Sequence, residues 1–183
     1  MMKAQLSKAG LADRLTPVFE AYGYEGASLS LLAKAAGLSK ASLYHHFPNG
    51  KRDMAAAVLA RAGARLQTLV IAPLHSAASP AERLGQSLEG VARLYEGDIP
   101  GSLMNSLLVG EGRGLFGAIV AGGVAAWEQA LAGVHEAAGK PTAAARDTAR
   151  QTLERIEGAL VLCRVEGSRA PLEAALTSLR GGL

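Results

Sequence analysis

The amino-acid sequence predicts an all-α protein, and three observations support that prediction. Alanine, leucine and glycine dominate the chain, 49% of its residues are hydrophobic, and aromatic residues are few, with three Phe, four Tyr and one Trp. No segment alternates β-branched and polar residues, as a half-buried strand would. Apolar residues instead recur three and four positions apart, which places them on one face of a helix. The expected architecture is therefore a set of packed helices without a sheet.

The first predicted helix runs from about Ser7 to Tyr22. Gly23 can end it, because glycine adopts the left-handed conformation found at many helix C-termini. Pro17 lies inside this helix, where proline removes a backbone donor and collides with the preceding turn. A kink is therefore expected at Pro17, or a helix that begins near it. The apolar face of the helix consists of Leu11, Leu15, Val18, Phe19 and Tyr22.

Two short helices are predicted next. Ser28 can cap a helix that continues to Ala36, and Ser39 can cap one from Lys40 to His46. Pro48-Asn49-Gly50 then breaks the chain. The further predicted helices cover about residues 51–70, 81–96, 102–109, 114–138, 142–166 and 170–179, with a boundary at Pro73 and residues 76–80.

The charge distribution separates the N-terminal third from the rest. The chain carries a net charge of +3, and residues 1–52 alone carry +4, from seven Lys and Arg against three Asp and Glu. A basic excess of this kind is typical of a module that binds a polyanion. A solvated basic face explains it equally well on charge alone.

The sequence indicates an intracellular setting. Cys163 is the only cysteine, so it cannot form an internal disulfide, and a reducing cytoplasm suits it. The N-terminus lacks the apolar segment of a signal peptide. No stretch of about 18 uncharged apolar residues indicates a membrane span. We therefore expect a cytoplasmic protein without a membrane partner.

The two short helices have the features of a helix-turn-helix. Ala33 and Ala36 are small enough for the second helix to cross the first closely. Gly37 tolerates the positive φ that the turn requires. Leu43 can anchor the second helix in the core. The polar or aromatic residues left to face outward are Lys40, Ser42, Tyr44, His45 and His46.

Other chemistry is poorly supported in this segment. Adjacent histidines on a helix point about 100° apart and make a poor chelate, so no metal site is expected at His45 and His46. Ser39 and Ser42 lack a carboxylate partner and an oxyanion hole, so no catalytic site is expected either. Tyr44 and Phe47 could both be core aromatics, and for Phe47 that interpretation is preferred.

The segment from Ser28 to Lys51 resembles the tetracycline-repressor (TetR) family of bacterial regulators. The match lies in the sequence Gly37-Leu-Ser-Lys-Ala-Ser-Leu-Tyr-His-His-Phe-Pro-Asn-Gly-Lys51 and the small residues before it. The Phe-Pro-x-Gly-Lys variant is similar to regulators of the LmrA/YxaF type. The strong resemblance covers about residues 11–66, and a weaker one covers residues 158–179.

This resemblance implies a DNA-binding surface. Lys51 falls where the family places a phosphate-binding lysine, and free N–H groups at a helix N-terminus also favour an anion there. Arg and Asn are absent from the presumed recognition helix, so Lys40 is the main candidate for reading a guanine. The implied DNA-contacting residues are Ser28, Ser30, Lys40, Ala41, Ser42, Tyr44, His45, His46 and Lys51.

The resemblance also implies a division of the chain. A helix-turn-helix DNA-binding domain would occupy residues 1–50, a connecting helix 51–72, and a helical effector-binding and dimerisation domain 73–183. The suggested effector-binding residues are Tyr95, Met104, Leu107, Leu108, Phe116 and Trp127, with Arg93, Asn105, Glu111 and His135 as polar candidates; core packing or solvation explains each of them as well.

Two helices near the C-terminus carry apolar stripes that could form a four-helix interface between two subunits. Packing within one subunit is the alternative, and the resemblance favours the homodimer. The stripe residues are Leu153, Ile156, Leu160, Cys163, Leu172, Leu176 and Leu179.

The expected function is that of a ligand-responsive repressor. It would bind a palindromic double-stranded DNA operator as a homodimer and be released by a small-molecule effector, with no cofactor and no catalytic residue. The alternatives are a helical protein-interaction or adaptor module with a vestigial helix-turn-helix, and a small-molecule-binding enzyme. Salt-dependent, sequence-selective DNA binding distinguishes the first from both alternatives.

Overall fold

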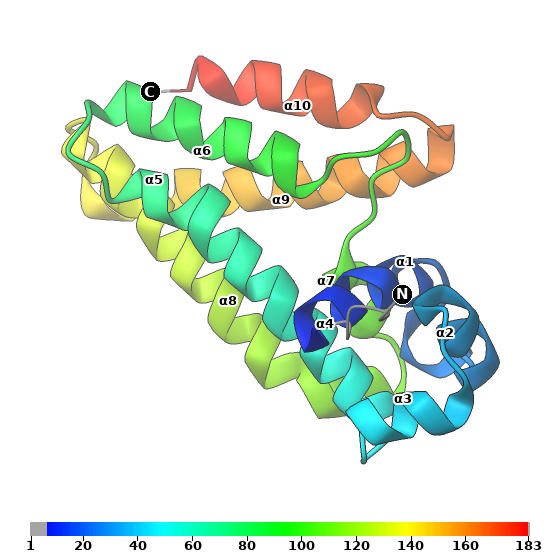
Figure 1. The fold of residues 1–183 in the computed structure, drawn as a ribbon. Coiled ribbons are helices and arrows are strands. Elements are labelled where there is room, and N and C mark those ends of the chain that lie inside the picture. The colour runs from blue at the N-terminus through cyan, green and yellow to red at the C-terminus, as the bar shows by residue number, and fades with distance from the viewer. Residues whose placement is uncertain (1–6, 183) are drawn as a thin grey trace, which may run out of the picture. The chain divides into compact units, whose positions relative to one another are not determined.

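A computed structural model describes residues 7–182 of the protein, and the described residues form helices without a strand (Figure 1). The prediction of an all-α fold is confirmed. The helices are α1 (Lys8–Gly26), α2 (Leu29–Ala36), α3 (Lys40–His46), α4 (Lys51–Leu66), a π-helical segment (Gln67–Ile71), α5 (Ala72–Leu74), α6 (Pro80–Leu94), α7 (Leu103–Leu107), α8 (Glu111–Ala137), α9 (Thr142–Glu166) and α10 (Ala170–Arg180).

The first helix breaks at Gly23 and not at Pro17. Gly23, with φ of 66° and ψ of −172°, is the residue inside α1 that has non-helical backbone angles. Pro17 stays helical, so the kink expected there is wrong. The predicted stop at Gly23 is confirmed, because the chain leaves the helix there and makes one more turn to Gly26.

The chain remains helical across Pro73, where a boundary was predicted. Pro73 has no N–H to donate to the carbonyl of Leu69, four residues earlier. The backbone widens into the π-helical segment, in which Ala72 N–H donates to Gln67 O, and helix α5 then ends at Leu74. Gly90 of α6 lies against the Leu69 carbonyl so closely that a Cβ at Gly90 would overlap that oxygen. A glycine is therefore required where α6 crosses this carbonyl.

The described chain divides into two compact units. The first holds residues 7–63 and 103–118, and the second holds residues 64–102 and 119–182. This division differs from the one expected from the sequence, since α7 and the first turns of α8 belong to the N-terminal unit. The reason is packing, because α7 lies against α1 and Ser106 Oγ donates to the carbonyl of Glu20 at 2.7 Å. Helices α4 and α8 each contribute to both units.

The second unit has a core built from α6, α8, α9 and α10. Trp127 of α8 and Leu88 of α6 are almost fully buried in it. Helix α10 packs on both α6 and α9, which lie side by side with it in Figure 1. Arg169, before α10, donates to the carbonyls of Ala92, Tyr95 and Gly97 and so caps the end of α6.

The apolar stripes of α9 and α10 face this core. Ile156, Cys163 and Leu172 have no exposed surface, and Leu153, Leu160 and Leu176 are at most 6% exposed. Leu179 packs against the same cluster. Six of the seven residues are thus enclosed by their own chain and offer little surface to a partner, whereas Leu179 is partly exposed; a role for these residues in a subunit interface stays a prediction. The alternative of packing within one subunit accounts for their burial.

Two described helical stretches, Lys51–Leu74 and Glu111–Ala137, are long and apolar enough to cross a membrane. Length and composition alone are weak evidence, because core helices satisfy the same criterion. Both stretches supply core residues, Val58 and Val70 from the first and Trp127 and Leu131 from the second. Their apolar character is explained at least in part by packing within the units.

Candidate nucleic-acid interface

The turn between α2 and α3 is fixed by backbone contacts. Gly37 adopts φ of 67°, and its N–H donates to the carbonyls of Ala33 and Lys34. Arg14 of α1 donates from Nη1 to the carbonyl of Ala36 at 2.9 Å. Because Ala33 and Ala36 are small and buried, α3 crosses α2 closely. The predicted helix-turn-helix geometry is confirmed, and the contribution of Arg14 is one that the sequence analysis missed.

Helix α3 has a buried face and an exposed face. Leu43 and the following Phe47 have no exposed surface, which confirms the predicted core roles of both. Ser39 caps the helix by accepting from Ser42 N–H at 3.1 Å, and its hydroxyl lies 2.9 Å from Ser42 Oγ. The hydroxyl of Ser42 is therefore already bonded within the helix. On α3 itself, the exposed residues of the predicted set are Lys40, Ala41, Tyr44 and His45.

Tyr44 is held over the turn that follows α3. The residue is 45% exposed, and its ring lies against Gly50. Gly50 adopts φ of 66°, and a Cβ there would lie 3.2 Å from Tyr44 Cε1. The ring thus packs on the turn while nearly half of the residue stays exposed, an arrangement suited to a phosphate contact.

The turn between α3 and α4 depends on Asp53, a residue that sequence reasoning missed. Asn49 N–H donates to Asp53 Oδ2 at 3.0 Å, and Asn49 Nδ2 donates to Oδ1 at 3.2 Å. These hydrogen bonds, the backbone one first, hold the pKa of Asp53 below its ordinary value. An Asn followed four residues later by an acid in the first turn of a helix was the available signal.

Lys51 is anchored at the start of α4. Its Nζ donates to the carbonyl of Glu25 at 3.1 Å and lies 4.7 Å from the centre of the Tyr24 ring. Glu25 lies three residues before Ser28, whose hydroxyl caps α2 by accepting from Leu31 N–H. The structure thus connects Lys51 to the segment that leads into α2, where Ser28 and Ser30 are exposed.

The two adjacent histidines do not converge. The rings of His45 and His46 lie 5.7 Å apart with planes at 75°, and His46 is half-buried. Among residues 7–182, no group of three or more His, Cys, Asp or Glu side chains is placed to hold a metal ion.

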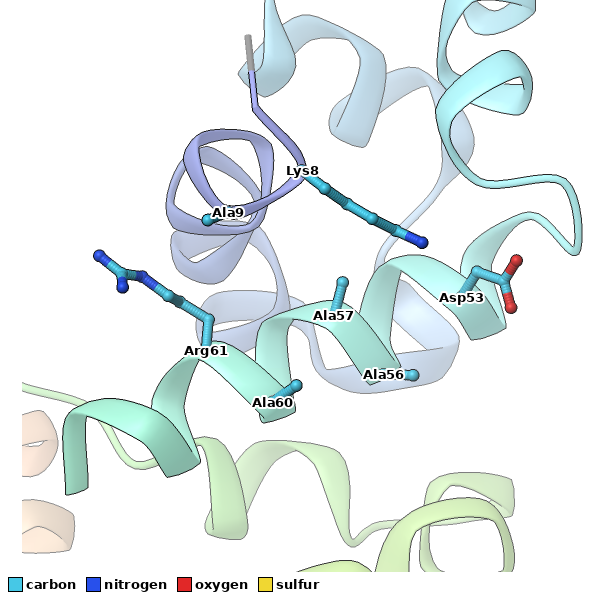
Figure 2. A pocket seen from close by; sticks show the side chains of 7 residues that line it. All are labelled: Lys8, Ala9, Asp53, Ala56, Ala57, Ala60 and Arg61. Atoms are coloured by element: carbon cyan, nitrogen blue, oxygen red, sulfur yellow. The ribbon is translucent and has the colours of Figure 1, made fainter. Parts of the chain in front are cut away.

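A groove of about 460 Å³ lies between α1 and α4 in the same unit (Figure 2). Its floor is made of alanines, and Lys8 and Arg61 stand at its rim. Arg61 is paired with Asp13 at 2.8 Å. The lining residues are Lys8, Ala9, Asp53, Ala56, Ala57, Ala60 and Arg61. None of them belongs to the predicted effector-binding set.

The predicted effector-binding residues are divided between the units. Met104, Leu107, Leu108 and Phe116 lie in the first, whereas Tyr95 and Trp127 lie in the second. Leu107 is buried, and Phe116 makes an edge-to-face contact with Tyr24 at 5.4 Å, so both contribute to packing in the first unit. Tyr95 donates from its hydroxyl to Glu157 at 3.3 Å, and Trp127 is a core residue.

Two family models match the chain. Residues 16–58 match the model described as bacterial regulatory proteins of the tetR family, and residues 117–178 match the C-terminal domain of LmrA/YxaF-like transcriptional regulators. Both models describe transcriptional regulators, and the helix-turn-helix with its exposed α3 fits that class. The chain belongs to the TetR family, within its LmrA/YxaF-like subgroup.

Two curated relatives come from Bacillus subtilis (strain 168). The uncharacterised HTH-type transcriptional regulator YxaF is 26% identical over 90 residues, which cover 49% of this chain and 47% of that protein. The HTH-type transcriptional regulator LmrA is 39% identical over 49 residues, which cover 27% of this chain and 26% of that protein. The chain thus matches less than half the length of each.

Solved structures share the fold along nearly the whole chain. A TetR transcriptional regulator from Chloroflexus aurantiacus J-10-FL is 20% identical with a TM-score of 0.76, over 95% of this chain and 92% of that one. AibR, solved in complex with isovaleryl coenzyme A and operator DNA, is 20% identical with a TM-score of 0.67, over 97% and 98%. At these identities the likeness establishes the fold alone.

Proposed function

We propose that the protein is a homodimeric, ligand-responsive repressor that binds a palindromic DNA operator. The observation that carries the proposal is helix α3, which is fixed by Gly37 and Ser39 and presents Lys40, Tyr44 and His45 to solvent on a basic unit. An exposed polar helix on a rigid support suits insertion into the major groove. A vestigial motif in an adaptor protein has no need for these exposed polar residues.

The proposed DNA contacts fall into two groups. Ser28, Ser30, Tyr44, His46 and Lys51 would bind phosphates and set the position of α3. Lys40, Ala41, Ser42 and His45 would face base edges, although Ser42 first has to exchange its bond to Ser39. Because Lys40 is the one long cation on this helix, base reading is expected to be sparse, and DNA shape would supply part of the specificity.

The test is selection of bound sequences from random duplex DNA, followed by titration of the winning sequence at several salt concentrations. Lys51→Ala is expected to weaken binding to all sequences alike, because a phosphate contact carries no sequence information. Tyr44→Ala is expected to abolish binding to the selected sequence while the melting temperature stays within a few degrees, since the ring is half exposed. Unchanged affinity in both variants would overturn the assignment.

The dimer surface proposed here is the outer face of α9 and α10. Val161, Leu162 and Val165 of α9 are 49%, 50% and 76% exposed. Three exposed apolar side chains so close together on one helix are typical of an interaction surface. A groove of about 600 Å³ lies beside them, with Gly158, Leu162, Pro171 and Ala174 among its lining residues. A second copy of the same helix pair can fill such a groove in a four-helix arrangement.

Sedimentation of a charged variant tests this surface. Val165→Glu is expected to convert the dimer to a monomer, because an unpaired carboxylate would be buried at the interface. Val109→Glu, at a residue 68% exposed in the first unit, is the matched control and should stay dimeric. A wild-type protein that sediments as a monomer at micromolar concentration would refute the homodimer.

The effector is proposed to be a small molecule that lowers operator affinity. Support comes from the shared fold with AibR, which was solved with both an acyl coenzyme A and operator DNA. The residues suggested by the sequence, Tyr95, Met104, Leu107, Leu108, Phe116 and Trp127, remain predictions. The test measures the Kd of a fluorescent operator duplex in the presence of each member of a small-molecule library, and a compound that raises the Kd is the expected result. A library in which no compound changes the Kd would contradict a ligand-responsive role.

A further inference from the structure

The end of α1 and the start of α8 are joined by one carboxylate. Glu25 Oε1 accepts from the N–H of Glu111, the first residue of α8, at 2.9 Å. The first N–H groups of a helix have no partner inside the helix, and a carboxylate satisfies them and matches the positive end of the helix dipole. Glu25 therefore caps a helix that begins 86 residues further along the chain.

The chain is shaped around this carboxylate. Gly110 adopts φ of 59°, and a Cβ on it would overlap Glu25 Oε1. At Gly23, with φ of 66°, a Cβ would lie 2.8 Å from the carbonyl of Ser106. The close approach at Gly23 brings the end of α1 against the backbone of α7, and the positive φ of Gly110 turns the chain beside the Glu25 carboxylate at the start of α8.

The same residue holds a DNA-facing cation. The carbonyl of Glu25 accepts from Lys51 Nζ at 3.1 Å, and the neighbouring Tyr24 ring lies 4.7 Å from that nitrogen. The carbonyl uses one of the three ammonium donors and leaves two for another oxygen. Tyr24 is itself fixed by its contact with Phe116 of α8. The ammonium is thus positioned by two residues that α8 holds in place.

We propose that Glu25 is a positioning residue for DNA binding. Its carboxylate fixes the end of α1 on α8, and its carbonyl then holds Lys51 beside the N-terminus of α2, where a phosphate can bind both. The proposal rests on the DNA-binding function argued above. It follows that the placement of Lys51 depends on the contact between Glu25 and Glu111 in the first turn of α8, although neither Glu25 nor Glu111 lies in the helix-turn-helix.

The direction in which DNA affinity changes when the Glu25 carboxylate is removed distinguishes a positioning role from simple charge repulsion. Removing a carboxylate from a surface near DNA ordinarily strengthens binding, because it reduces repulsion of the phosphates. If Glu25 positions Lys51, its loss weakens binding instead. A neutral side chain that keeps the acceptor, as in Glu25→Gln, should retain affinity at or slightly above that of the wild type.

The experiment titrates fluorescent random-sequence duplex DNA with the full-length protein between 50 and 200 mM salt. One phosphate contact contributes about 0.9 to the slope of log K against log salt and about an eightfold change in affinity at 0.1 M salt. Glu25→Ala and Lys51→Ala are each expected to show that loss. The double variant should bind like Lys51→Ala alone, because both changes remove the same contact. Asp13→Ala, which also removes a carboxylate from the first unit, is the charge-matched control and should bind no more weakly than the wild type.

The outcomes test the DNA-binding function and the positioning role of Glu25 separately. A wild-type protein that fails to bind DNA refutes the proposed function. A wild type that binds, with Glu25→Ala binding as well or better, refutes the positioning role and leaves the function standing. Additive losses in the double variant also refute it. If Glu25→Ala does not fold, Glu25→Asp, which keeps the charge but is one methylene too short to reach Glu111 N, replaces it with the same expected loss.

Discussion

The two units of the protein differ in the contacts that order the helices within each of them. In the first unit, side chains bind specific backbone groups: Arg14 the end of α2, Asp53 the turn before α4, and Glu25 the start of α8. In the second unit, the helices pack into one apolar cluster around Trp127 and the inner face of α9, although Arg169 there also binds backbone carbonyls at the end of α6. Polar contacts fix orientation, whereas apolar packing is tolerant of it. Directional contacts of this kind suit the first unit, which holds α3 with one face exposed.

The largest expected effect contrasts the two faces of α9. Ile156→Ala should lower the free energy of unfolding by about 2–5 kcal/mol, because a fully buried side chain leaves a cavity. Val165→Ala, at a residue 76% exposed, should change the stability of the subunit by less than about 0.5 kcal/mol. Urea denaturation, at a protein concentration where both variants have the same oligomeric state, measures both. Equal losses would mean that the inner and outer faces have been assigned incorrectly.

The next effect concerns two glycines of α6. Gly90→Ala should destabilise the second unit by about 1–3 kcal/mol, because its Cβ overlaps the carbonyl of Leu69 and two helices have to separate. Gly85 lies in the same helix with nothing within 4 Å of an added Cβ. Gly85→Ala should therefore stabilise by about 0.5–1 kcal/mol through helix propensity. Thermal unfolding followed by circular dichroism should show shifts of opposite sign, and shifts of the same sign would contradict the close crossing.

The sequence predicted the first unit well because its signals are local. Ser28, Ser39 and Gly37 each act on backbone groups within a few residues, so their roles follow from spacing. Glu25 and Gly110 act on each other across 85 positions, and nothing near either residue indicates the contact. Apolar spacing predicted which residues of α9 share one face of the helix, but not whether that face packs within the subunit or against a partner. A stripe packed in its own core and a stripe packed on a partner have the same period.

A smaller effect is expected at the cap of α3. Ser39→Ala should cost about 1 kcal/mol, because the N–H of Ser42 loses its acceptor. The same change at Ser79, which forms a capping box with Glu82 in the second unit, should cost a similar amount. The two variants differ in function, since Ser39→Ala loosens the DNA-facing helix and should weaken operator binding. Operator binding weakened equally by both would remove the functional distinction between the units.

The smallest effect at neutral pH, and one confined to the second unit, concerns His135. This side chain is 1% exposed, and neither ring nitrogen has a hydrogen-bond partner within residues 7–182. Burial first, and then the charge of Lys140, lower its pKa below the ordinary value of 6.5. A buried neutral imidazole favours the folded state fully above pH 6.5, and stability is lost as the pH falls below that value, because the unfolded chain then binds the proton more readily.

The free energy of unfolding, measured by urea titration between pH 7.5 and 5, should therefore decline more steeply for the wild type than for His135→Leu. That variant removes the titrating group and also the two unpaired nitrogens, so it should be at least as stable as the wild type at the acid end. Parallel pH profiles for the wild type and His135→Leu would contradict this account. They would show that the buried imidazole finds a partner when it is protonated, as a side chain in a polar site would.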